Sequence, residues 1–203
     1  MKPADDLARI SRSTLVWQQY DPAVKCDLWS TAVLTPAGVY LIDPIELAAS
    51  AIEMLNADAA VAGVIVTNEN HFRAAPLFCE RFSVPMLLHR NLLEIAGDAA
   101  VAVDGALRNT TLDAIDLPGA PQGEVAIFNG AGDGEMIVGD ALINFEPYGF
   151  SLLPKKYCTD QRLMRRSLNR LLDHSFERLL FAHGTPITSG ARTRLEQLLL
   201  AVQ

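Results

Sequence analysis

The 203-residue sequence has few cysteines and no long hydrophobic run. Its three cysteines, Cys26, Cys79 and Cys158, show neither a CxxC motif nor another close ligand spacing, which argues against a thiolate metal site. The longest strongly apolar stretch, AAVAGVIV, is too short to span a bilayer, and the first twenty residues lack the apolar core of a signal peptide. We therefore expect a cytoplasmic protein with no membrane partner.

Positive charge is also in deficit. Lys and Arg number 17 against 24 Asp and Glu, which gives a formal net charge of -7. A protein that binds nucleic acid neutralises many phosphates with Lys and Arg, which an excess of negative charge opposes. We therefore expect no nucleic-acid partner. The arginine-rich stretch RLMRRSLNRLL, residues 162–172, is interpreted as the solvated face of a helix, because leucines occupy its opposite side.

Half of the residues are hydrophobic and 20% are charged, as in an ordinary globular protein, and the length suits a single domain, 1–203. The pattern predicts strands in clusters, each closed by helices, which favours two packed sheets with helices outside. The expected strands are 14–20, 27–34, 38–43, 63–67, 85–89, 114–118, 124–130, 135–140 and 178–184. The expected helices are 47–58, 73–82, 91–97, 160–173 and a last one that ends at 202. Residues 146–160 are expected to form an ordered lid or binding loop.

The stretch VIVTNENHFRAA, residues 64–75, begins as a buried strand and turns abruptly polar. Open α/β sheets place their chemistry outside the carboxyl ends of their strands. We therefore predict a binding loop here, with Asn68, Asn70, His71 and Arg73 as its candidate ligand-binding residues. The simpler alternative is that Asn68 or Asn70 caps the following helix.

Four strand-end motifs, in this order and spacing, resemble those of the metallo-β-lactamase superfamily. They are VYLIDP (39–44), VIVTNENHFR (64–73), GEMIVGDALI (134–143) and LLFAHG (179–184). The resemblance covers about residues 14–202 and implies a four-layered αβ/βα sandwich with a metal site at one edge.

The second of these motifs departs from the family pattern, Thr-His-x-His-x-Asp-His, which supplies ligands to a dinuclear metal site. Thr67 matches the threonine. The four ligand positions carry Asn68, Asn70, Phe72 and Arg73. Amides are poor substitutes for imidazole, so the resemblance implies that the usual dinuclear centre is absent.

Elsewhere the family ligand positions are only partly kept. Asp140 stands at the bridging-carboxylate position and His183 in the last motif, but Ala120 replaces the histidine of the Gly-His-x-x-Gly turn. Asp43 resembles a family aspartate that supports the site loop. Making His71 a ligand would slide the loop and displace its threonine, so we discount that register, although loop movement could still bring His71 inward.

An arginine at a former ligand position can place a permanent cation where the metal charge was. We therefore predict that Arg73 pairs with Asp140, with His183 nearby. The loop also precedes a helix, whose free amide groups could help it to hold a small anionic ligand such as a carboxylate or phosphate. Lys155 and Lys156 would add to the field that attracts such a ligand.

Three functions stay open at this point. The first interpretation is a hydrolase-like protein with a largely lost metal site and no cofactor, which binds a small anion. The alternative is a working hydrolase, either with a single Zn, Fe or Mn ion on Asp140, His183 and a third group such as His71, or metal-free with His71 or His183 as general base. The third is a structural or partner-binding protein, and a homo-oligomer is possible.

Overall fold

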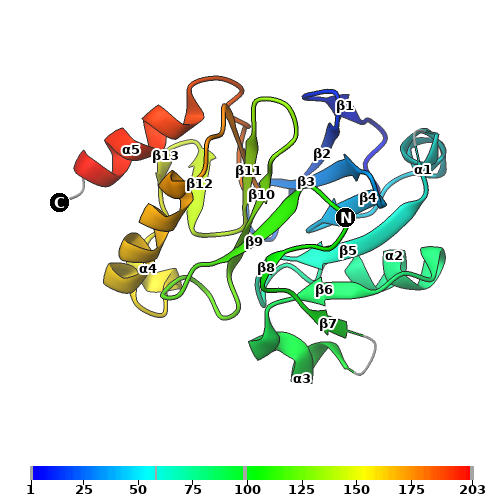
Figure 1. The fold of residues 1–203 in the computed structure, drawn as a ribbon, viewed down its shortest axis with the longest axis horizontal. Helices are drawn as coiled ribbons and strands as arrows, with labels where there is room; N and C mark the ends of the chain where they lie inside the picture. The colour runs from blue at the N-terminus through cyan, green and yellow to red at the C-terminus, as the bar shows by residue number, and fades with distance from the viewer. Residues whose placement is uncertain (1, 58, 98–99, 202–203) are drawn as a thin grey trace.

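The computed structural model of the chain describes residues 2–57, 59–97 and 100–201. Two sheets pack face to face and helices cover their outer faces (Figure 1). No helix in these ranges is long and apolar enough to cross a membrane.

The first sheet has seven strands in chain order, antiparallel from β1 to β4 and parallel from β4 to β7. Its strands are β1 (Ala8–Arg9), β2 (Thr14–Asp21), β3 (Cys26–Thr35), β4 (Gly38–Ile42), β5 (Val61–Val66), β6 (Met86–Leu88) and β7 (Ala100–Ala102). The helical segments along this part of the chain are α1 (Ala49–Asn56), α2 (Ala75–Phe82), the 3-10 helix η1 (Arg90–Leu92) and α3 (Leu93–Ala96).

The second sheet has the order β14-β11-β10-β9-β8, with β14 parallel to β11 and the other pairs antiparallel. A separate hairpin, β12–β13, extends beside it. The strands are β8 (Gly105–Ala106), β9 (Leu112–Asp116), β10 (Val125–Asn129), β11 (Glu135–Val138), β12 (Leu142–Phe145), β13 (Gly149–Leu152) and β14 (Arg178–Phe181). The helical segments are η2 (Lys155–Tyr157), α4 (Gln161–Leu168), η3 (Asn169–Asp173) and α5 (Ala191–Ala201).

Three hydrophobic clusters hold the layers together. Successive residues of β5 belong to two different clusters. Val64 and Val66 pack in the cluster between the first sheet and its helices, whereas Ile65 packs in the cluster between the two sheets. A strand covered on both faces is apolar throughout, as this one is. On the other side, Met164 of α4 and Leu195 of α5 are fully buried in the third cluster. This order of helices, sheet, sheet and helices confirms the predicted four-layered sandwich.

The longer predicted strands and helices are all present, with boundaries that shift by a few residues. The predicted helix 160–173 is an α-helix followed by a 3-10 turn, and residue 202 of the last helix and residue 58 of the first lie outside the described residues. The predicted loop 146–160 includes strand β13, because the aromatic and apolar residues of this stretch pair with β12. The single-domain assignment stays a prediction.

The pairing brings four strand ends to one edge. Strands β4 and β5 are parallel neighbours, as are β11 and β14, so each pair ends on the same side. The backbone N–H of Trp29 in β3 donates to the carbonyl of Ala182 at 2.9 Å, which joins the chain after β14 to the first sheet. Residues that follow strands of both sheets can therefore meet there.

Gly184 fixes the chain immediately after β14. Its φ of +109° is unusual for an L side chain, and an added Cβ would lie 2.1 Å from the carbonyl oxygen of Asn144. We expect Gly184→Ala to lower the free energy of unfolding by about 3 kcal/mol or more, because backbone strain and overpacking add. The control is Gly132→Ala. Its φ is also positive, +61°, but an added Cβ would meet no atom within 4 Å other than those of its chain neighbours. Equal losses in urea unfolding of the two variants would contradict this account.

Candidate functional site

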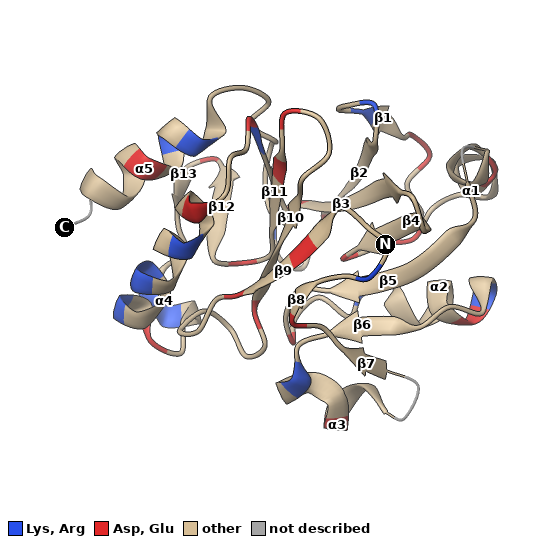
Figure 2. Ribbon diagram, viewed as in Figure 1, with Lys and Arg blue, Asp and Glu red and all other residues tan. Residues whose placement is uncertain are grey.

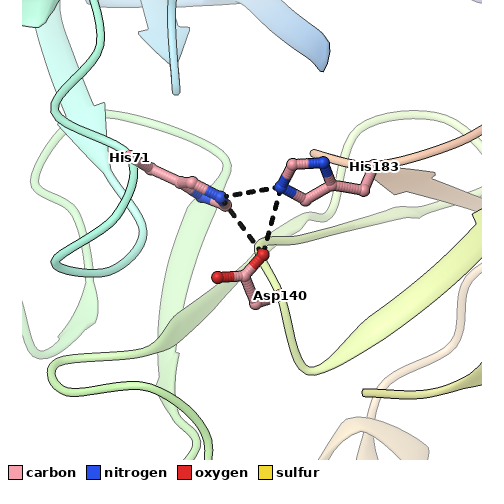
Figure 3. Close-up of side chains that lie close together, drawn as sticks. All are labelled: His71, Asp140 and His183. Atoms are coloured by element: carbon pink, nitrogen blue, oxygen red, sulfur yellow. Dashed lines mark hydrogen bonds and ion pairs between the residues drawn. The ribbon is translucent and has the colours of Figure 1, made fainter. Parts of the chain in front are cut away.

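Three side chains converge at the shared strand edge: His71, Asp140 and His183 (Figure 3). His71 comes from the loop after β5, Asp140 from the turn after β11 and His183 from the segment after β14. The Oδ1 atom of Asp140 lies 3.3 Å from Nε2 of His71 and 3.2 Å from Nε2 of His183, and the two Nε2 atoms are 3.2 Å apart. The three potential ligand atoms thus form a nearly equilateral triangle.

This triangle has the size of a metal-ligand face. Around a tetrahedral zinc with bonds of about 2.0–2.1 Å to nitrogen and oxygen, neighbouring ligand atoms lie about 3.3 Å apart. Two imidazoles and one carboxylate suit zinc, and the same set with open positions suits ferrous iron. The residues present therefore fit one divalent metal ion.

Asp43 fixes the orientation of His71. It is buried and follows β4, and its Oδ2 lies 2.9 Å from Nδ1 of His71. Thr67 donates its backbone N–H to Oδ1 of Asp43 at 2.8 Å and its hydroxyl to Oδ2 at 2.5 Å. A carboxylate only accepts, so Nδ1 of His71 carries a proton and Nε2 is directed at Asp140. The supporting role that the resemblance implied for Asp43 matches these contacts.

Cys26 contacts the second histidine of the triad, His183. Its Sγ lies 3.5 Å from Nδ1 of His183, so it can hold that ring from the side opposite Asp140. Burial raises the pKa of the Cys26 thiol, which keeps it neutral at physiological pH. The sequence carried no signal for this contact, because the two residues are 157 positions apart.

The second oxygen of Asp140 is held by amides. Asn68 and Asn70 each donate from Nδ2 to its Oδ2 at 3.1 Å. Asn68 also donates to Oε2 of Glu124 at 2.6 Å, and Glu124 is fully buried. Burial and the charge of Asp140 raise the pKa of Glu124 to about 8. The two asparagines at former ligand positions thus orient Asp140, whereas the importance of Glu124 was missed by the sequence analysis.

The protonation state of the cluster follows from its charges. Burial disfavours a charged His71, but the charges of Asp140 and Asp43 outweigh it and raise the pKa of His71 to about 9. Burial lowers the pKa of His183. Although burial acts in the opposite direction, His71 and His183 hold the pKa of Asp140 well below its ordinary value. Without a metal, His71 therefore carries a positive charge between two carboxylates.

This arrangement predicts how the stability of metal-free protein depends on pH. The folded pKa of His71 is about 9 and lies above the reference value of 6.5, so its contribution is complete below pH 6.5 and is lost as pH rises through 9. The loss amounts to at most about 3 kcal/mol. Urea unfolding in chelator at pH 6 and pH 9.5 measures it. Stability is also lost at Glu124, whose pKa is raised to about 8, in the same direction as pH rises through 8. The loss between pH 6.5 and 9 should therefore be smaller in His71→Gln than in the wild type but not absent, and an equal loss in the two proteins would contradict the assignment.

The predicted ion pair between Arg73 and Asp140 is not formed. Arg73 instead donates to three backbone carbonyls, those of Trp29 and Asp43 from Nη1 at 2.7 and 3.0 Å and that of Ala182 from Nη2 at 3.3 Å. This prediction was wrong because the guanidinium satisfies strand-end carbonyls at the junction of the two sheets. The cation beside Asp140 is His71.

The anion-binding features predicted for the loop are also mostly engaged elsewhere. At the start of α2 the N–H groups of Ala74 and Ala75 donate to backbone carbonyls, and Pro76 has no N–H. Lys155 and Lys156 are exposed on η2, and among the described residues neither has a hydrogen bond or ion pair with the triad. Binding of a small anion therefore stays a prediction.

Comparison with known proteins agrees with this architecture. A family model described as the metallo-beta-lactamase superfamily matches residues 7–202. Similar solved structures include the DIM-1 metallo-beta-lactamase, with 10% identity and a TM-score of 0.76 over 100% of this chain and 99% of that one. A metallo-beta-lactamase from Pontibacter korlensis has 15% identity and a TM-score of 0.73 over 98% and 99%. TTHA1623, in a di-iron-bound form, has 20% identity and a TM-score of 0.63 over 88% and 97%.

No match was found among curated proteins. The low identities to the solved structures support the fold alone. The family model, in contrast, covers almost the entire sequence, and its range includes every residue of the site described above. The chain therefore belongs to the metallo-β-lactamase superfamily.

Proposed function

We propose that this protein is a hydrolase whose active site binds one divalent metal ion through His71, Asp140 and His183. The observation that carries the proposal is the triangle of ligand atoms, with edges of 3.2 to 3.3 Å. It favours the predicted single-metal alternative over the metal-free interpretation. Zinc, iron or manganese would suit the donor set.

Bound there, the metal would polarise a substrate oxygen and lower the pKa of a coordinated water toward neutrality. The protein residues have separate tasks. Asp43 keeps the proton of His71 on Nδ1, so that Nε2 stays free to bind. Asn68 and Asn70 hold Oδ2 of Asp140, which leaves Oδ1 as the single ligand atom.

Asn70 also offers a contact for substrate. Its side chain is exposed, and its amide nitrogen has a second N–H beyond the one given to Asp140. A donor beside the metal position can stabilise the oxyanion that develops in acyl or phosphoryl transfer. A small anionic substrate remains our prediction for this site.

The second candidate is metal-free hydrolysis, favoured by the contacts of His71 with two carboxylates. A protonated His71, with a pKa of about 9, is satisfied by Asp43 and Asp140 without any metal. The lowered pKa of His183 would leave it neutral and able to act as a general base.

Hydrolysis assays with and without metal distinguish the two candidates. We would measure initial rates on nitrocefin, p-nitrophenyl acetate and bis(p-nitrophenyl) phosphate, using protein stripped on a chelating resin and then reloaded with Zn, Mn or Fe(II). The proposal predicts turnover that requires reloading and is lost in Asp140→Ala. Turnover that is unchanged by stripping but lost in His183→Ala would instead establish the metal-free candidate.

A further inference from the structure

A recess with both polar and apolar lining lies away from the triad of His71, Asp140 and His183. It is a groove of about 610 Å³ between α4, β13 and α5. Arg162, Arg165 and Arg166 of α4 line it, and Leu152 and Leu198 supply apolar surface. None of its lining residues belongs to the triad or contacts it through a hydrogen bond or ion pair that the described residues show.

The three arginines share one face of α4. Arg162 precedes Arg165 by three positions and Arg166 by four, so their side chains are neighbours on the helix surface. Like charges at this spacing destabilise a helix, and among the described residues none of the three forms a salt bridge. Figure 2 shows this concentration of positive residues on α4 beside α5.

One carboxylate near the groove, Asp160, interacts electrostatically with Arg162 and Arg166 and offsets part of their charge. Its Oδ1 accepts from the backbone N–H groups of Arg162 and Leu163 as the N-cap of α4. No aspartate or glutamate lines the groove. Arg165 uses one N–H for the carbonyl of Leu199 at 3.3 Å, which positions its guanidinium between α4 and α5. Guanidinium groups therefore dominate the charge of this recess.

The size and lining of the groove indicate the ligand class. Small-molecule sites usually have volumes of about 300–1,000 Å³, with a few polar groups on an apolar surface. Gln161 and Asn169 also line the groove, but their amide nitrogens donate to backbone carbonyls. The donors for a ligand are therefore the guanidinium groups, which match phosphate oxygens through paired N–H bonds. We propose that this groove binds a small organic phosphate with two or more phosphate groups. A nucleic-acid backbone fits less well, because the net charge of -7 opposes an extended phosphate chain.

Isothermal titration calorimetry with inorganic pyrophosphate and ATP tests this proposal. The protein would be the full chain, stripped of metal on a chelating resin so that the triad cannot bind phosphate through a metal. We expect saturable binding at one site, weakened at least about tenfold in the Arg162→Gln/Arg166→Gln double variant, because charge-assisted hydrogen bonds are lost. Both side chains are exposed, so the variant should fold normally.

The matched control is Arg81→Gln/Arg108→Gln, which removes the same charge from two exposed arginines outside the groove. Its affinity for both probes should equal that of the wild type. Equal weakening in the two double variants, or no saturable binding of either probe, would overturn the proposal. Binding of a 20-nucleotide single-stranded DNA without binding of pyrophosphate or ATP would overturn it too, and would make the groove a nucleic-acid surface. None of these outcomes depends on whether the triad holds a metal.

Discussion

Replacing His183 by alanine is expected to lower the affinity for zinc more than about 100-fold. Its Nε2 is one of three ligand atoms, and loss of even an outer partner of a metal ligand usually costs 10–100-fold. Two remaining protein ligands fall below the three that catalytic zinc usually has. Competition with a chromogenic zinc chelator measures this affinity, and Asp140→Ala should behave in the same way.

The matched control is His174→Ala. This imidazole packs 4.6 Å from the ring of Phe128, outside the triad, and its removal should leave zinc affinity unchanged. If His183→Ala bound zinc as tightly as His174→Ala does, His183 would not be a ligand. Because His183 is partly exposed, its loss should change the folded structure little.

The Asp43 variants are expected to separate stability from metal binding. Asp43→Ala leaves Nδ1 of the buried His71 and two Thr67 donors without their acceptor, while Nε2 of His71 still faces Asp140. It should lower the free energy of unfolding by about 3–5 kcal/mol. Asp43→Asn should cost less, since asparagine tolerates the φ of +48° at this position. Its amide can donate to Nδ1 of His71, however, which moves the imidazole proton to Nε2 and blocks a metal ligand.

We therefore expect Asp43→Asn to weaken zinc binding about 10–100-fold while most of the stability remains. Urea unfolding in chelator and zinc titration measure the two effects on the same preparations. The control is Asp27→Ala, which removes an exposed carboxylate of β3. If the Asp43→Asn variant bound zinc as tightly as the wild type, Asp43 would have only a structural role.

The fold was largely predictable because its strong signals are local. Apolar runs that end in polar residues mark β5, β11 and β14, and four such strand ends indicated the superfamily. The short strands β1, β7 and β8 and the β12–β13 hairpin were not predicted. Each has only two to four residues per strand and depends on pairing with distant partners, which sequence periodicity does not reveal.

At the site, motif positions and actual contacts differ. Asp140 and His183 were predicted as a surviving pair, and the structure places them 3.2 Å apart. His71 sits at a non-ligand position of the family motif and was discounted as a ligand. It nevertheless faces Asp140, because Asp43 and Thr67 turn its ring inward. Loop conformation and long-range hydrogen bonds decide this, and neither can be read from residue spacing.

Metal content is the most direct test of the central claim that one metal ion binds to the triad. Protein purified without chelator or nickel affinity resin would be incubated with Zn, Mn and Fe(II), desalted and analysed by inductively coupled plasma mass spectrometry. We predict one retained metal ion per chain in the wild type and almost none in His183→Ala. No retained metal in the wild type, or the same content in the variant, would contradict the claim.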